Sequence, residues 1–197
     1  MIAAPMVHAW LFPVVQGAAD DPAMLSVLGH REIERVGRLG WRRDRDRAVC
    51  ARVAARIEAG RRLGIAACEV PLDDDGPPSF RGVDTTVSWS HSGHWIALAL
   101  GCGRPVGIDI EEEPEHLDLD ALAELDVRSL EEFVALEAAS KATACVYDGA
   151  WPPGVALRRL SAPRGYVAAV ASTGSDWKVE LHMRSPLHIV EHTMAAC

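Results

Sequence analysis

Two acidic residues alternate with apolar ones in the stretch PVGIDIEEE, residues 105–113. An alternation with a period of two is typical of a β-strand, so Asp109 and Glu111 should share one face of it, about 7 Å apart. Two carboxylates held this close repel each other unless a cation lies nearby. The sequence therefore predicts that a positive charge accompanies this strand.

A helix with a charged pair on one face is predicted for the segment SLEEFVALEAASKATACV, residues 129–146. Ser129 and Glu132 have the spacing of a capping box, which marks the start of a helix. Glu137 and Lys141 are four residues apart, so their side chains lie on one face of it. An apolar stripe recurs at the same spacing, at Leu130, Val134, Ala138 and Ala142.

This helix and the strand together hold the residue types of a magnesium site that handles phosphate. If the charged face contacts the strand, Glu137 joins Asp109 and Glu111 in a set of three carboxylates, and such oxygen ligands suit Mg²⁺. Lys141 would then stand beside a phosphate group as a point charge. The alternative is that Glu137 and Lys141 form an ordinary ion pair on the protein surface.

The other elements follow from hydrophobic period and turn residues. The apolar start of the chain, residues 1–15, predicts a first strand. Val49, Val53 and Ile57 are spaced for an amphipathic helix over residues 45–64. Further strands are predicted at 86–90, 95–100 and 106–111 and on either side of the turn 163–165.

Length and composition fit a soluble globular protein. The chain has 197 residues, of which 49% are hydrophobic and 24% charged, enough for one large domain or two small ones. A boundary between two halves would fall near residues 101–104. The apolar N-terminal stretch has no basic leader region and is interrupted by Pro5, His8 and Pro13. We therefore expect neither a signal peptide nor a membrane span.

Cysteines and histidines give no clear metal or disulfide pattern. The five cysteines are odd in number and contain no C-x-x-C pair, which argues against a disulfide framework or a zinc ribbon and favours a cytoplasmic location. His182, His188 and His192 could form a metal-binding tract. No cysteine or carboxylate cluster accompanies them, so we interpret this segment as a solvated tail.

Charge is distributed unevenly within a net charge of −8. Residues 31–62 contain eleven arginines and five acidic residues, whereas residues 109–132 contain eleven acidic residues and one arginine. This asymmetry suggests an anionic ligand held with the help of a cation. Nucleic acid fits less well, because Trp41 is the only aromatic residue of the basic stretch and the whole chain is acidic. The plainer alternative is that most of these arginines solvate a helix.

The motifs, taken in order, resemble those of one enzyme family. They are REIERVGRLGWRRDRDRAVCARVAAR at 31–56, SWSHSG at 88–93, ALAL at 97–100, PVGIDIE at 105–111, EAASKA at 137–142 and GYVAAVA at 165–171. This order is similar to that of the 4'-phosphopantetheinyl transferases of the large, surfactin-synthetase-activating type. The resemblance covers nearly the whole chain, and its most specific part is G-x-D-x-E followed by E-A-x-x-K-A.

The resemblance implies a fold and an activity. The fold would be α+β, with two similar α/β halves, 1–103 and 104–197, related by a pseudo-twofold axis. Each half would be a small, mainly antiparallel sheet packed on helices, and a monomer would bind coenzyme A between its halves. The enzyme would transfer the phosphopantetheine arm of coenzyme A to a serine of an apo acyl or peptidyl carrier protein and release 3',5'-adenosine bisphosphate.

Matched position by position, the resemblance also implies the roles of the acidic residues and the lysine. Asp109, Glu111 and Glu137 would hold Mg²⁺, and Lys141 would contact the diphosphate of coenzyme A. A serine hydroxyl attacks poorly until its proton leaves, so a general base is needed. We assign that role to Glu137, acting directly or through a metal-bound water.

Four further residues match the family's contacts to coenzyme A phosphate. Ser90 and His91 fall on the serine and histidine of its S-H-S turn, where the histidine faces a phosphate. Arg47 and Arg35 fall where the family places basic contacts to the 3'-phosphate. The first half would thus supply phosphate contacts, and the second half the metal and diphosphate site.

Some positions depart from the family's pattern. The tryptophan and lysine of W-x-x-K-E-A are replaced by Phe133 and Leu136, and Pro77 replaces the lysine of a G-K-P motif near the adenine site. A degenerate member that binds coenzyme A or carrier proteins without turnover is therefore one alternative. A metal-dependent phosphohydrolase using the same carboxylates is another, although no second-metal set is visible. The carrier could belong to fatty-acid, polyketide or nonribosomal-peptide synthesis.

Overall fold

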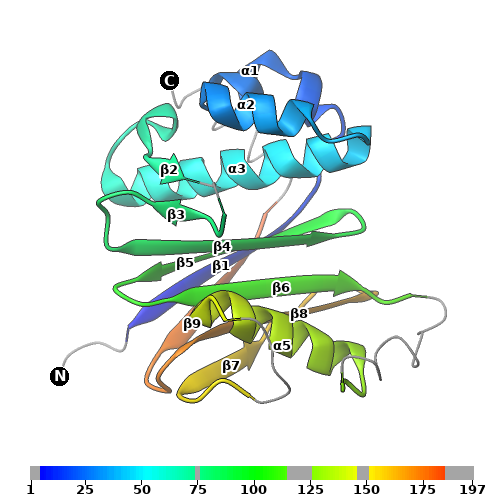
Figure 1. Cartoon of the computed structure of the whole chain (residues 1–197), viewed down its shortest axis with the longest axis vertical. Helices are drawn as coiled ribbons and strands as arrows, with labels where there is room; N and C mark the ends of the chain where they lie inside the picture. Colours follow the sequence, from blue (N-terminus) through cyan, green and yellow to red (C-terminus); the bar gives the residue numbers. More distant parts are fainter. Residues whose placement is uncertain (1–4, 74–75, 115–125, 146–150, 185–197) are drawn as a thin grey trace.

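Two β-sheets lie face to face between two layers of helices in this α+β protein (Figure 1). The structure is a computed structural model, and it describes residues 5–73, 76–114, 126–145 and 151–184. One long helix covers the outer face of the first sheet, two shorter helices pack against that long helix, and a fourth helix covers the outer face of the second sheet (Figure 1). In the described residues, no helix is long and apolar enough to cross a membrane.

The first sheet has six strands in the order β2-β3-β4-β5-β1-β9. Their bounds are Met6–Pro13 for β1, Leu72–Asp73 for β2, Ser79–Phe80 for β3, Thr85–Ser92 for β4, Trp95–Cys102 for β5 and Lys178–Met183 for β9. Strand β9 pairs in parallel with β1, whereas the other pairs are antiparallel. The first sheet is therefore larger and more mixed than the small, mainly antiparallel sheet expected for residues 1–103.

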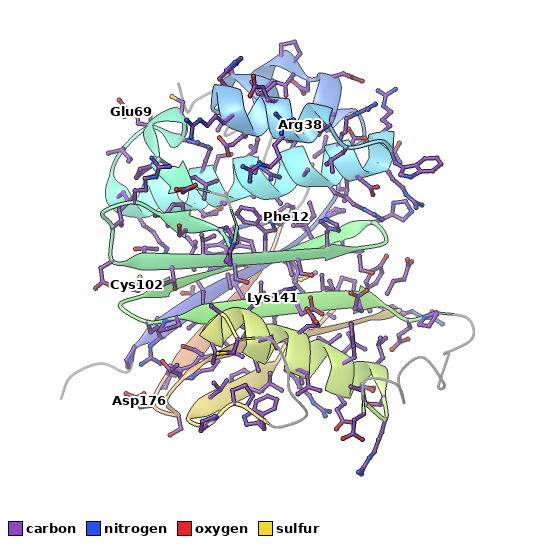
Figure 2. All side chains as sticks on the ribbon, viewed as in Figure 1. Phe12, Arg38, Glu69, Cys102, Lys141 and Asp176 are labelled. Atoms are coloured by element: carbon purple, nitrogen blue, oxygen red, sulfur yellow. The ribbon has the colours of Figure 1, made fainter. Side chains whose placement is uncertain are left out.

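The helical layer over this sheet is dominated by a long, largely buried helix. The helical segments are η1 (Ala18–Asp20), α1 (Pro22–Ser26), α2 (His30–Gly37), α3 (Arg42–Leu63) and η2 (Ala67–Glu69). Val49, Val53 and Ile57 face the sheet from α3, and Phe12 packs beneath them in the same core (Figure 2). A buried ion pair of 2.6 Å between Glu32 and Arg56 ties α2 to α3.

The second sheet has three antiparallel strands in the order β6-β8-β7. The strands are β6 (Val106–Glu112), β7 (Val155–Arg159) and β8 (Tyr166–Thr173), and helix α5 (Leu130–Thr143) covers their outer face. The helix starts as predicted, because the Ser129 hydroxyl accepts a hydrogen bond from the Glu132 amide. Its predicted stripe is buried at Val134 and Ala138.

Part of the element order recurs along the chain when η1, α1, α2, η2, β2 and β3 are left out. The segments β1-α3-β4-β5 and β6-α5-β7-β8 each contain a strand, a helix and two further strands. In both, the last strand lies in the middle and pairs antiparallel with its two neighbours. The inner faces of the two sheets share one apolar core, which includes Leu11, Ala97, Ile108 and Val170.

Cys68 is disulfide-bonded, which the spacing of the cysteines did not predict.

Candidate functional site

Alternate serines of β4 connect the first sheet to the acidic strand β6. Ser90 donates a hydrogen bond of 2.7 Å to Asp109 Oδ1, and Ser92 donates one of 2.7 Å to Glu111 Oε2. Ser88 accepts a hydrogen bond of 3.1 Å from the Ile108 amide. These contacts join β4 of the first sheet to β6, an edge strand of the second sheet, through side chains. They also hold the two predicted carboxylates on the β4 side of β6.

Helix α5 approaches β6 at the level of the backbone. At Gly107, a Cβ atom would overlap the carbonyl oxygen of Ala138 and the amide nitrogen of Ala142. The glycine of G-x-D-x-E therefore lets the helix lie directly against the strand. This closeness brings Lys141 Nζ to 2.7 Å from Asp109 Oδ1 and 3.4 Å from the Ile108 carbonyl oxygen.

We expect Gly107→Ala to destabilise the protein by about 1–3 kcal/mol, because the added methyl group overpacks the contact between strand and helix. The measurement is the free energy of unfolding from urea titration. Gly37→Ala is the matched control, since nothing lies within 4 Å of a Cβ at that position. Equal stability of the two variants would mean that α5 does not contact β6 at this distance.

Asp109 is a buried carboxylate with only part of its hydrogen-bonding capacity used. Its side chain is 2% exposed and pairs with Lys141, so the cation predicted beside this strand is a lysine of the same chain. Its second oxygen, Oδ2, is buried without a hydrogen-bond partner. A buried carboxylate oxygen in that state is costly, and a bound cation would satisfy it.

Negative charge accumulates around Glu111. Burial raises the pKa of the Glu111 carboxyl, and the charges of Asp109 and Glu137 raise it further, while the hydrogen bond from Ser92 and the charge of Lys141 oppose the shift. The raised pKa shows that these carboxylates repel one another, and a divalent cation bound between them would relieve that repulsion. Oxygen donors of this kind, together with the unpartnered Oδ2 of Asp109, fit Mg²⁺.

The three carboxylates are nevertheless less tightly grouped than a formed metal site. In the described residues, the ligand atoms that gather within 4.8 Å of one another belong to a different group, His8, Glu180 and His182. Lys141 pairs with Asp109 rather than with Glu137. Shared binding of Mg²⁺ by Asp109, Glu111 and Glu137 would therefore require side-chain rotation.

A cavity of about 860 Å³ lies between β4 and α5, beside this cluster. Glu137 and Lys141 line it from the second half, and Trp89 and the Pro77–Pro78 turn line it from the first. Apolar side chains at Val127, Phe133 and Leu136 complete its wall. The cavity thus connects the predicted adenine-side turn with the predicted diphosphate lysine.

Arg47 and His91 lie near the turn between β4 and β5. Arg47 donates hydrogen bonds to the Gly93 carbonyl oxygen and to Asp44. The pKa of His91 is lowered, first because the surrounding protein removes water from the ring and second because Arg47 is close. The Arg47 side chain also lines a hollow of about 770 Å³ with His94. Arg47 and His91 thus both lie near the β4–β5 turn, but His91 does not line the hollow, and the hollow shares no lining residue with the cavity beside Lys141.

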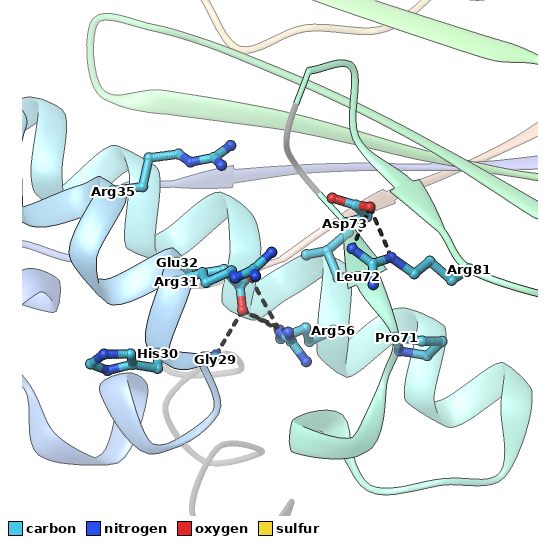
Figure 3. A pocket seen from close by; sticks show the side chains of 10 residues that line it. All are labelled: Gly29, His30, Arg31, Glu32, Arg35, Arg56, Pro71, Leu72, Asp73 and Arg81. Atoms are coloured by element: carbon cyan, nitrogen blue, oxygen red, sulfur yellow. Dashed lines mark hydrogen bonds and ion pairs between the residues drawn. The ribbon is translucent and has the colours of Figure 1, made fainter.

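Arg35 lies elsewhere, on α2. It lines a separate pocket of about 400 Å³ that also contains the Glu32–Arg56 and Asp73–Arg81 ion pairs (Figure 3). That pocket shares no lining residue with the hollow beside Arg47. The two arginines that the resemblance places at one phosphate thus line different pockets.

Sequence reasoning missed three polar residues that organise the site. Ser88 and Ser92 hold β6, and only Ser90 of the three serines was singled out. The signal was present in SWSHS, because a serine at every second position of a strand faces one side. The Tyr166 hydroxyl was also missed; it accepts from the His94 amide and donates to Glu112.

Comparison with protein-family models and with curated proteins gives no relative that could assign this site. No protein-family model matches the chain, and no match was found among the curated proteins. A function for this chain must therefore be argued from its residues and their geometry.

Proposed function

We propose that this protein transfers the 4'-phosphopantetheine arm of coenzyme A to a serine of an apo acyl or peptidyl carrier protein, with Mg²⁺ as cofactor. One observation carries the proposal: three motifs meet in one chain of contacts. Ser90 of SWSHSG bonds Asp109 of G-x-D-x-E, 19 residues away, and Asp109 pairs with Lys141 of E-A-x-x-K-A, 32 residues away. Nothing in the spacing alone requires these residue types to meet.

The arrangement of the two halves supports the same proposal. The repeated strand-helix-strand-strand connectivity is what a pseudo-twofold axis between residues 1–103 and 104–197 would produce. The cavity of about 860 Å³ is lined from both halves, so a ligand bound there would contact each of them. We infer that coenzyme A binds in this cavity, with its diphosphate beside Lys141.

The proposed reaction is an in-line phosphoryl transfer. A bond forms between the carrier's serine oxygen and the phosphorus of the phosphopantetheine arm, and the bond from that phosphorus to the bridging oxygen breaks. The leaving group is 3',5'-adenosine bisphosphate. Negative charge develops on the phosphoryl oxygens and on the leaving group, and Lys141 would stabilise it from the wall of the cavity.

Two carboxylates would supply the other functions of the reaction, namely cation binding and proton acceptance. Asp109 holds the Lys141 ammonium in place and offers its unpartnered Oδ2 to a cation. Bound Mg²⁺ would supply charge neutralisation at the diphosphate. Glu137 is half-buried and lines the cavity on the same helix face as Lys141, so it is placed to accept the proton of the serine hydroxyl.

The decisive experiment incubates the protein with coenzyme A, Mg²⁺ and a panel of purified apo carrier proteins from fatty-acid, polyketide and nonribosomal-peptide systems. The expected result is a mass gain of one phosphopantetheine arm on a carrier, with release of 3',5'-adenosine bisphosphate. Binding of coenzyme A without any mass gain would indicate a degenerate family member. Release of the bisphosphate without a carrier would indicate a phosphohydrolase.

The assignment of Arg47 and His91 to the 3'-phosphate makes a prediction about ligand affinity. Dephospho-coenzyme A should bind more weakly than coenzyme A by about 1.5–3 kcal/mol, the worth of a charge-assisted hydrogen bond. Arg47→Ala should weaken the binding of coenzyme A. It should change the affinity for dephospho-coenzyme A little, because that ligand lacks the 3'-phosphate charge that Arg47 would contact. Calorimetric titration of both ligands into both proteins completes the cycle.

Two controls separate ligand binding from structural support by Arg47. Because Arg47 bonds the Gly93 carbonyl oxygen, the free energy of unfolding of Arg47→Ala must be measured alongside. Arg42→Ala removes a neighbouring arginine that lines the same hollow and pairs with exposed Asp20, and it should affect both ligands alike. Equal losses for both ligands on Arg47→Ala would assign that residue to the fold and would leave the 3'-phosphate contact to be reassigned.

A further inference from the structure

Two histidines and a carboxylate form a compact group on β1 and β9, outside the site described above. His8 Nδ1 lies 3.1 Å from Glu180 Oε2, and His182 Nε2 lies 3.6 Å from Glu180 Oε1. One potential ligand atom from each residue lies within 4.8 Å of the others. His182 therefore belongs to an ordered strand and contradicts the interpretation of this segment as a solvated tail; His188 and His192 lie outside the described residues.

The backbone register builds this group. His8 lies directly opposite Glu180 in the parallel pair of β1 and β9, and His182 lies opposite Trp10. Residues two apart on a strand share a face, so the four side chains lie on the same side of the sheet. The Trp10 ring stacks on His182 with 5.2 Å between ring centroids, and on His8 with 6.1 Å. This stacking limits how the imidazole rings turn.

The two histidine side chains are largely shielded from solvent, whereas the glutamate side chain is exposed. His8 and His182 are 16% and 22% exposed, whereas Glu180 is 51% exposed, so the group is open to solvent on the carboxylate side. Burial lowers the pKa of His8, and the nearby Arg62 lowers it further.

We propose that His8, Glu180 and His182 bind one late first-row divalent transition ion, of which Zn²⁺ is the probe, with water completing the coordination. Ligand atoms around tetrahedral zinc are about 3.3 Å apart, given metal–ligand bonds near 2.0–2.1 Å. His8 Nδ1 and His182 Nε2 lie 3.1 and 3.6 Å from the two different oxygens of Glu180, so each nitrogen–oxygen separation is near this spacing, and small side-chain rotations would bring both nitrogens around one ion. Two imidazoles and one carboxylate suit such an ion and not Mg²⁺, which takes oxygen ligands.

Such an ion would join β9 to β1, and so would stabilise the attachment of the last described strand to the first. The test titrates ZnCl₂ into the full chain and follows heat and the midpoint of thermal unfolding. We expect one equivalent to bind and to raise that midpoint, as any ligand specific for the folded state does. Loss of a residue that only hydrogen-bonds a metal ligand lowers metal affinity by ~10–100-fold. His8→Gln and His182→Gln each replace a ligand itself, so each should lower zinc affinity by more than that.

The controls make the outcome decisive. Glu180→Gln changes the most exposed ligand and should lower zinc affinity without loss of folding, which the unfolding midpoint in the absence of metal will show. His30→Gln removes an exposed helical histidine that pairs with Glu34, and should bind zinc like the wild type. Wild-type affinity in the His8, Glu180 and His182 variants, or no binding by the wild type, would overturn the proposal. Zinc binding by the Asp109→Asn protein would show that this site is independent of the proposed transferase site.

Discussion

The Asp109→Asn protein is expected to fold like the wild type and to transfer phosphopantetheine at least ~10²–10³-fold more slowly. The amide keeps the shape of the side chain but removes the charge that pairs with Lys141 and that would face Mg²⁺. Because the lost group is a charge and not a weak metal contact, excess Mg²⁺ should restore little activity. The measurement is the initial rate of mass gain on a carrier protein, with the free energy of unfolding measured in parallel.

Asp176→Asn is the matched control for this prediction. Asp176 also pairs with a basic residue, Arg104, but its side chain is 70% exposed, so the substitution should leave the transfer rate unchanged. The wild-type protein in the presence of a chelator should lose activity as Asp109→Asn does. A wild-type rate for Asp109→Asn would mean that β6 is only an acidic edge strand.

Lys141→Ala should lower kcat strongly with a smaller change in KM. The reason is that Lys141 is proposed to meet charge that develops in the transition state, so its loss affects the chemical step more than binding. Lys141→Arg should not restore the full rate, because a planar guanidinium does not replace a compact ammonium at 2.7 Å from Asp109. Steady-state kinetics with coenzyme A as the varied substrate separates the two constants.

The chain offers a direct control for the lysine as well. Its only other lysine, Lys178, is exposed at the start of β9, and Lys178→Ala should leave both constants unchanged. If kcat of Lys141→Ala equals that of the wild type, Lys141 serves only to neutralise Asp109 within the fold.

The central strands and the helix α5 could be predicted because local patterns specify them. The alternation in VGIDIE predicted β6, and Ser129 with the four-residue stripe predicted α5, whose N-cap is Ser129 but which ends at Thr143 and not at 146. The turn between β4 and β5 is shorter than predicted, since β4 continues to Ser92. Pairing that depends on distant segments could not be read locally, and β9 is the clearest case: its parallel partner β1 lies about 170 residues earlier.

For the site, the sequence indicated which residue types gather but not their exact partners. The expected contact between the charged face of α5 and β6 is present, and it depends on the close approach at Gly107. The sequence paired Lys141 with a phosphate or with Glu137, whereas its neighbour is Asp109. Such a choice depends on distances of an ångström or two across a tertiary contact, and residue spacing within one helix does not determine them.

The attachment of β9 to β1 has a consequence for how the polypeptide can be divided. A fragment ending at residue 103 would keep five strands of the first sheet but would leave the eight-residue strand β1 as an open border, with unpaired amide and carbonyl groups. Its buried side chains Val7, Ala9 and Leu11 would also lose their cover from the second sheet. A long apolar edge of this kind pairs readily with strands of other molecules, so we expect the two sequence halves to fold as one unit and not as separate soluble fragments.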